Sequence, residues 1–134
     1  MRVEVVVEDE APGRRHTTVL QLGWRRSDPL AVSLVVTAQP DHPALPRGRW
    51  VVLRDFLRYG LEEPTGDGDV RLRPDASGQR MVIELMRCGR PASVSIPADT
   101  VRRFLDATEA IVPTGEERSE AALDALIDRL LRST

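Results

Sequence analysis

The chain has 134 residues, of which 41% are hydrophobic and 30% are charged, a composition typical of one folded domain rather than of a disordered segment. The formal net charge of -2 gives no basic excess that would attract nucleic acid or an anionic membrane. Cys88 is the only cysteine, which excludes an internal disulfide and a thiolate metal cluster. The N-terminal residues include acids where a signal peptide needs an apolar core, and no apolar run approaches the ~20 residues of a membrane span, so we expect a cytoplasmic protein.

Four strands are predicted in the first part of the chain. Apolar residues recur at every second position over 3–8, 18–24 and 30–36, which is typical of strands with one buried face. Residues 39–48 contain three prolines and are predicted to form a loop. A fourth strand is expected at 50–53.

The central stretch 47–74 is predicted to contain a strand, a short helix, a turn and a further strand. The segments before and after it are expected to complete the sheet to which these strands belong. From Arg54 the apolar spacing changes to that of a helix, with Leu53, Phe56, Leu57 and Leu61 expected on its inner face. Gly60 can end this helix in a left-handed conformation, and Pro64 prevents its continuation. Residues 65–69 predict a tight reversal before a strand at 70–73.

The second half repeats the pattern of a meander followed by helix. Strands are predicted at 81–88, apolar on both faces, and at 92–96. A helix follows Pro97, with an inner stripe of Val101, Phe104, Leu105, Thr108 and either Ile111 or Val112. Ser119 can cap a final helix that ends near Leu130. The sequence therefore predicts a single α+β domain over 1–134, with two antiparallel meander sheets in the order four strands, helix, three strands, two helices.

Few residues are suited to catalysis. His16 and His42 are the only histidines, both are expected in loops, and solvated side chains are the favoured interpretation. Cys88 lies between Arg87 and Arg90, which could lower the pKa of a thiol, but a small hydrophobic residue at a strand end explains it better. No nucleophile elbow, phosphate-binding loop or metal-binding spacing is present. We therefore expect no catalytic, metal or cofactor site.

Nucleic-acid binding is the alternative that the arginine pairs keep open. Pairs occur at 14–15, 25–26 and 102–103, but binding of single strands also requires exposed aromatic side chains for base stacking. Trp24, Trp50 and Phe104 all fall on predicted inward faces. Core packing is therefore their favoured role.

Residues spread over most of the chain resemble the SsgA-like family of sporulation and cell-division proteins from actinobacteria, and most closely its SsgB branch. The central run is specific, because strand-helix-strand packing alone does not require it. The matching residues are Asp28-Pro29, Ala31-Val32, Trp50, Arg54-Asp55, Leu57, Gly60-Leu61, Pro64-Thr65-Gly66, Gly68-Asp69-Val70-Arg71, Pro74, Phe104-Leu105, Thr108, Val112-Pro113 and Gly115-Glu116.

The resemblance implies a non-enzymatic regulator of septum placement during spore formation. Such a protein would act at the division septum as an adaptor that contacts the tubulin-like Z-ring protein FtsZ and related family members. The resemblance also implies a fold like that of the Whirly single-stranded nucleic-acid-binding proteins and assembly into a homo-oligomer, most simply a trimer. A single-stranded nucleic-acid-binding protein of this fold is the alternative, although fold kinship alone is weak evidence of function.

Two groups of residues are candidates for the site. The connection 62–69 is the preferred partner contact, because it is acidic and loops on a rigid sheet commonly carry contacts; its residues are Glu62, Glu63, Thr65, Asp67 and Asp69. A solvated turn without a partner is the alternative for this connection. The structural motif consists of Trp50, Arg54, Asp55, Gly60, Pro64, Gly66, Gly68 and Arg71. Within it, Asp55 is expected to face the positive end of the helix dipole, and Arg54 to reach Asp67 or Asp69.

Overall fold

The computed structural model describes residues 1–8, 15–36, 48–87, 89–117, 127 and 130–132. Within these residues, the main secondary structure comprises eight strands and two helices. They are β1 (Arg2–Glu8), β2 (Arg15–Arg25), β3 (Asp28–Val36), β4 (Gly48–Leu53), α1 (Arg54–Gly60), β5 (Thr65–Asp67), β6 (Val70–Pro74), β7 (Arg80–Arg87), β8 (Arg90–Pro97) and α2 (Ala98–Ile111).

All eight strands belong to one antiparallel sheet with the order β4-β3-β2-β1-β8-β7-β6-β5. Consecutive strands are neighbours within each half, and β1 joins the halves by pairing with β8 at Val6–Ser95, Val7–Val94 and Glu8–Ser93. The prediction of two separate sheets is therefore wrong. Alternation along a strand shows which face is buried, but it does not show which strand lies along each edge.

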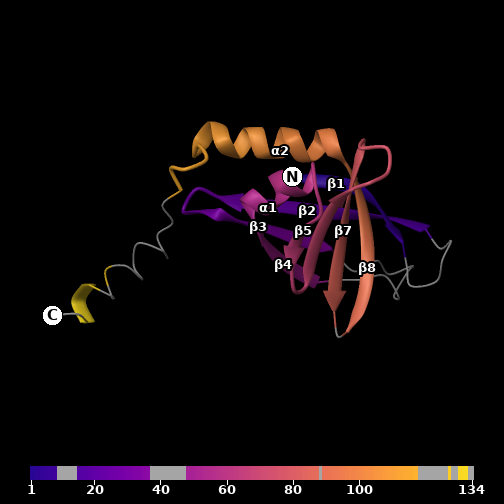
Figure 1. Cartoon of the computed structure of the whole chain (residues 1–134), viewed down its shortest axis with the longest axis horizontal. Helices are drawn as coiled ribbons and strands as arrows, with labels where there is room; N and C mark the ends of the chain where they lie inside the picture. Colours follow the sequence, from indigo (N-terminus) through magenta and orange to yellow (C-terminus); the bar gives the residue numbers. More distant parts are fainter. Residues whose placement is uncertain (9–14, 37–47, 88, 118–126, 128–129, 133–134) are drawn as a thin grey trace.

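The sheet is strongly twisted, so that its two halves enclose a common core. Strands of the first half run across Figure 1, whereas β7 and β8 run down it. The indole Nε1 of Trp50 on β4 donates a hydrogen bond of 3.1 Å to the carbonyl oxygen of Met86 on β7, although these strands are far apart in the strand order. The largest fully buried side chains come from both halves and both helices: Val5, Val7, Leu20, Leu22, Leu34, Leu57, Leu72, Met81, Ile83, Leu85, Ile96 and Leu105.

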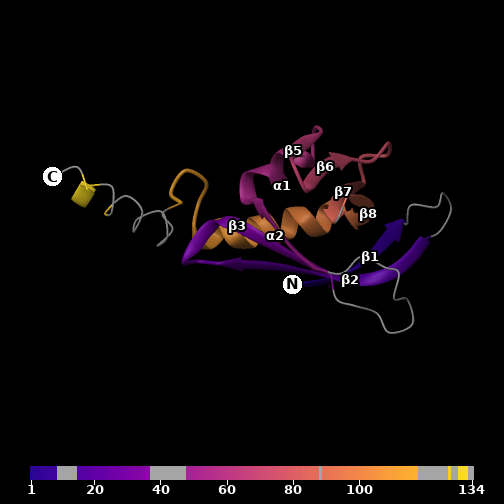
Figure 2. The same ribbon diagram turned by 90° about the horizontal axis from the view of Figure 1, so that it is seen from below.

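The two helices cover this core at one side of the sheet. In Figure 1, α2 lies along the top of the molecule, and Figure 2 shows it between the two halves. Its buried residues are Ala98, Val101, Phe104, Leu105 and Thr108, which confirms the predicted stripe. At its end Ile111 is exposed, whereas Val112 is half-buried. The choice that the sequence left open is therefore resolved in favour of Val112.

Several local predictions need correction or fall outside the described residues. His16 lies in β2 opposite Val7 rather than in a loop. Residues 65–67 form the short edge strand β5, so only the end of the predicted reversal is a turn. His42, Cys88 and most of the final predicted helix lie outside the described residues. No helix in the described part of the chain is long and apolar enough to cross a membrane.

Candidate functional site

The residues predicted to contact a partner lie along the connection from α1 to β6, at the β5 edge of the sheet. Glu62 and Glu63 are exposed just after α1, and Asp69 is exposed in the turn before β6. The Thr65 hydroxyl donates a hydrogen bond of 3.0 Å to the carbonyl oxygen of Glu63 and so holds the start of β5. The backbone of Asp67 pairs with Val70 at the end of the hairpin. These five residues are close in the sequence, and the structure places their stretch of chain at the β5 edge of the sheet.

The sequence had suggested an acidic surface at this segment. The structure shows that the neighbouring surface also carries arginines. Arg71 lies directly opposite Gly66 in the β5–β6 pair. Arg71 and Arg73 line an open hollow of about 250 Å³ together with Thr65 and Glu84. Arg73 also approaches Glu84, with Nε 3.7 Å from Oε1. The acidic connection therefore lies next to the arginines of the strand that follows it, and a partner would meet both signs of charge.

Two glycines shape the β5–β6 hairpin. Gly66 has φ of 117°, and a Cβ there would lie 2.5 Å from the carbonyl oxygen of Val70 and 3.1 Å from the Cα of Arg71. Gly68 has φ of 67°, but no atom lies within 4 Å of a Cβ placed there. Gly66 is thus required by both conformation and space, whereas Gly68 is required by conformation alone.

Gly60 serves a different purpose from the one predicted. Its φ is not in the left-handed region, and a Cβ at this position would lie 2.6 Å from the Cβ of Leu72. The glycine therefore allows the end of α1 to approach β6 closely.

Arg54 is the best-connected residue of the predicted motif, but its partners are not the predicted ones. It is 2% exposed and points away from the 62–69 connection, toward the end of α2. One terminal nitrogen (NH1) donates to the carbonyl oxygen of Val112 at 2.8 Å and to the hydroxyl of Thr108 at 3.4 Å. The other (NH2) pairs with Glu117 Oε1 at 2.8 Å. The described partners of Arg54 therefore lie at the end of α2 and at Glu117, and they do not include the predicted Asp69; the side chain of Asp67 lies outside the described part of the structure.

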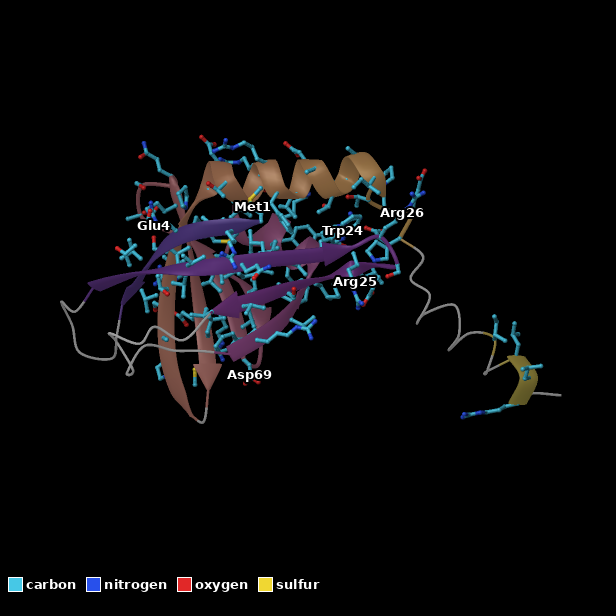
Figure 3. All side chains as sticks on the ribbon, turned by 180° about the vertical axis from the view of Figure 1, so that it is seen from behind. Met1, Glu4, Trp24, Arg25, Arg26 and Asp69 are labelled. Carbon is cyan, nitrogen blue, oxygen red and sulfur yellow. The ribbon has the colours of Figure 1, made fainter. Side chains whose placement is uncertain are left out.

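The surroundings of Arg54 suit a buried cation. Its guanidinium carbon lies 5.8 Å from the centre of the Trp24 ring, within range of a cation–π interaction. Trp24 is itself fixed by a hydrogen bond of 3.0 Å from Nε1 to the carbonyl oxygen of Pro29. Figure 3 shows Trp24 near the tip of the β2–β3 hairpin, below the end of α2. The Nε atom of Arg54 has no hydrogen-bond partner among the described residues.

Glu117 completes this network from the segment that follows α2. Its Oε2 accepts a hydrogen bond of 2.7 Å from the backbone N–H of Gly115, while Oε1 accepts from Arg54. The hydrogen bond from Arg54 holds the pKa of Glu117 below its ordinary value of 4.5, and burial opposes this effect in part. The carboxylate therefore stays charged and tied to Arg54 at neutral pH.

A second link joins the same two helices one turn further along. Arg58 pairs with Glu109 at 2.6 Å, and the hydroxyl of Thr114 donates to the same carboxylate. Both side chains of this pair are partly exposed, so it contributes less than the buried Arg54–Glu117 pair. Asp55 stands in the first turn of α1, as predicted from the helix dipole.

The described residues offer no group of three or more histidine, cysteine or acidic side chains that could hold a metal ion.

The exposure of the aromatic side chains differs in part from the prediction. Trp50 and Phe104 are buried and Trp24 is half-buried, but Tyr59 on α1 is 54% exposed. Apolar periodicity did not single out Tyr59, because this residue lies off the inner stripe of the helix.

Comparison with known proteins identifies relatives over most of the chain. Sporulation-specific cell division protein SsgB from Streptomyces coelicolor is 42% identical over 112 residues, which cover 82% of this chain and 79% of the relative. SsgB from Kineococcus radiotolerans is 38% identical over 86 residues, or 61% of this chain, but the match spans only 52% of that protein. The chain therefore corresponds to about half the length of this second relative.

Solved structures show the same fold. A structure obtained in work on SsgB mutations and longitudinal cell division during sporulation of Streptomyces coelicolor superposes with a TM-score of 0.72 at 30% identity, covering 87% of this chain and 89% of that chain. An SsgA-like sporulation-specific cell division protein from Thermobifida fusca gives a TM-score of 0.75 at 25% identity, covering 96% and 92%. The family model described as Streptomyces sporulation and cell division protein SsgA matches residues 19–117. This chain therefore belongs to the SsgA family.

Proposed function

We propose that this protein acts in sporulation-specific cell division as a non-enzymatic adaptor at the septum, where it contacts FtsZ and related family members. The observation that carries the proposal is its 42% identity to the sporulation-specific cell division protein SsgB of Streptomyces coelicolor over 82% of the chain. An adaptor requires a rigid scaffold and an exposed contact surface rather than an activated nucleophile.

The arrangement of the helices supports a rigid scaffold. Arg54 and Arg58 of α1 tie that helix to α2 and to the segment after it, through bonds of 2.8 and 2.6 Å to Glu117 and Glu109. The connection 62–69 leaves α1 directly and ends in a hairpin whose turns are set by Gly66 and Gly68. Loops held in this way commonly carry binding residues.

The contact surface in this proposal combines the acidic connection with its basic neighbours. Glu62, Glu63, Asp67 and Asp69 would meet basic groups of FtsZ or of a family partner, and Arg71 and Arg73 would meet acidic groups. Complementary charges of this kind raise the rate of association and weaken at high salt.

The proposal is tested by co-sedimentation with FtsZ polymers at several salt concentrations. The variant E62Q/E63Q/D67N/D69N is expected to lose most of the co-sedimentation seen at low salt. A matched control, E4Q/D99N/D106N/E116Q, removes four exposed carboxylates elsewhere and should bind as the unmodified protein does. Equal binding by both variants would show that the connection 62–69 is not the contact. Absence of co-sedimentation of the unmodified protein would contradict the proposal that this protein is an adaptor for FtsZ.

Binding to single-stranded DNA in the same buffers distinguishes the alternative. The adaptor proposal expects weak binding that disappears at moderate salt. Tight binding that is lost when Arg25, Arg26, Arg102 and Arg103 are replaced by glutamine would instead favour a nucleic-acid-binding protein.

A further inference from the structure

The outward face of β3 and β4, on the side of the sheet opposite the core, carries exposed apolar side chains. The register places Ala31 beside Leu53 and Ser33 beside Val51, so these side chains share one face. Val51 is 57% exposed and Leu53 is 47% exposed, whereas the alternate residues of β4 are buried. Leu53 was predicted on the inner face of α1, but it ends β4 and points outward instead.

This face differs from the usual outer face of an antiparallel sheet, which is polar where it meets water. Val35 lies on the same face and is half-buried, and an open hollow of about 380 Å³ is lined in part by Ala31, Ser33 and Val51. The buried residues of α1 and α2 belong to the core on the opposite face, so neither helix covers this one. The face is therefore suited to receive the apolar side chains of a further element.

A second exposed apolar surface lies at the C-terminus. Ile127, Leu130 and Leu131 are helical and are 45%, 60% and 68% exposed. Their spacing of three and four residues places them on one face of the helix. Figures 1 and 2 show the described C-terminal residues well away from the sheet and from α2. A short helix is only marginally stable alone in water and depends on packing of its apolar face, so this face requires a partner surface.

The charges beside the two apolar surfaces are complementary. Arg49 lies two residues from Val51 on the same face of β4, is exposed, and makes no hydrogen bond or ion pair with a described residue. In the sequence of the C-terminal segment, Glu120, Asp124 and Asp128 recur every four residues before Arg132. A helix over these positions would carry the three acids in one row beside its apolar face. The acids would therefore meet Arg49 when the two apolar surfaces are in contact.

We propose that the C-terminal segment of one copy of this chain packs its apolar face on the outward face of β3 and β4 of a second copy. Ile127, Leu130 and Leu131 then cover Val51 and Leu53. The position of the C-terminal residues away from their own sheet favours a second copy over the same copy as the partner. Each copy offers one segment and one sheet face, so the contact is head-to-tail and joins copies in a ring or an open chain.

This inference does not depend on contact with FtsZ, because assembly is measured on the full chain alone. The unmodified protein is expected to show a mass in light scattering well above the 14.9 kDa of one chain. I127D/L130D places charges on the C-terminal segment and V51D/L53D places them on the sheet face; each variant should have the mass of a single chain. The control Y59D/I111D alters two side chains that are 54% and 52% exposed elsewhere, and it should keep the unmodified mass.

Mixing the two variants tests the head-to-tail contact directly. I127D/L130D keeps an intact sheet face and V51D/L53D keeps an intact C-terminal segment, so one contact can form between them. The mixture is therefore expected to contain a species of twice the 14.9 kDa of one chain, although neither variant assembles by itself. A contact within one copy, or between two identical surfaces, would not produce this species.

Three results would overturn the proposal. They are a single-chain mass for the unmodified protein, an unchanged mass for either variant, and a mixture that contains only single chains. Loss of assembly in Y59D/I111D to the same extent as in the two variants would also overturn it. If circular dichroism shows that V51D/L53D does not fold, Val51→Asp alone takes its place in both measurements, because this residue is the more exposed of the two.

Discussion

Arg54 connects more of the structure than any other residue of the predicted motif. It starts α1, and its guanidinium contacts the end of α2, the ring of Trp24 and the carboxylate of Glu117. A buried ion pair adds little net stability compared with apolar packing, but removing one partner leaves an uncompensated buried charge. The pair is therefore expected to matter most when it is broken.

Replacing Arg54 with methionine should lower the free energy of unfolding by about 3 kcal/mol, because it leaves the Glu117 carboxylate buried without its cation. Urea denaturation measures the change. Arg102→Met is the control, since its pair with Asp99 is exposed and should be worth less than about 1 kcal/mol. A double variant, Arg54→Met with Glu117→Gln, should recover part of the loss. Equal effects of Arg54→Met and Arg102→Met would contradict a structural role for the buried pair.

The same pair predicts a dependence on pH. The pKa of Glu117 is lower in the folded protein than its ordinary value of 4.5, so its contribution is fully present above pH 4.5 and is lost as the pH falls through the folded pKa. The difference in unfolding free energy between the unmodified protein and Glu117→Gln should therefore shrink below pH 4.5. The Ser77 hydroxyl also lowers the pKa of Asp75, but Asp75 is present in both proteins and cancels in the comparison. A difference that stays constant on acidification would show that the charge of Glu117 does not matter.

Among the secondary-structure elements, the β5–β6 hairpin depends most directly on backbone conformation. Gly66→Ala should cost about 2–3 kcal/mol, because the left-handed strain is joined by a clash with the Val70 carbonyl and the Arg71 backbone. Gly68→Asn should cost less than about 1 kcal/mol, since asparagine tolerates this conformation and the space is open. Thermal unfolding of the two variants checks the order. A larger loss for Gly68→Asn would mean that the clash at Gly66 is relieved by movement of the edge strand.

Closure of the twisted sheet around its core is tested at Trp50. Trp50→Phe keeps an aromatic ring in the core but removes the Nε1–H bond to Met86, and it should cost about 1–2 kcal/mol from the lost bond and the smaller ring. Trp24→Phe, which removes a comparable bond to Pro29 within one hairpin, is the matched variant. Hydrogen exchange should increase in both β4 and β7 for Trp50→Phe, but near the β2–β3 turn for Trp24→Phe. Protection lost only in β4 would mean that the two halves are held together without this bond.

The association state is a further prediction for the assembled protein. We expect a homo-oligomer, most simply a trimer, with a mass in light scattering of about three times the 14.9 kDa of one chain. The motivating feature is the apolar second face of β7, where Val82 and Met86 are half-buried in the single chain. A mass of one chain at micromolar concentration would contradict it.

Sequence periodicity was sufficient for the parts of the fold that depend on near neighbours. Side chains alternate across a strand and recur every three or four residues on a helix, so the inward residues of β3 and the stripe of α2 could be predicted from the residue types alone. The specific run around Arg54 and Gly60 likewise pointed to the SsgA family through the identity and spacing of its residues.

Only the tertiary structure decided which distant segments meet. The pairing of β1 with β8 and the bond from Arg54 to a carboxylate 63 residues away both join parts of the chain that local patterns treat separately. Each strand's pattern specifies which side chains turn toward the core, whereas the choice of neighbour follows from the packing of the whole core, to which every element contributes.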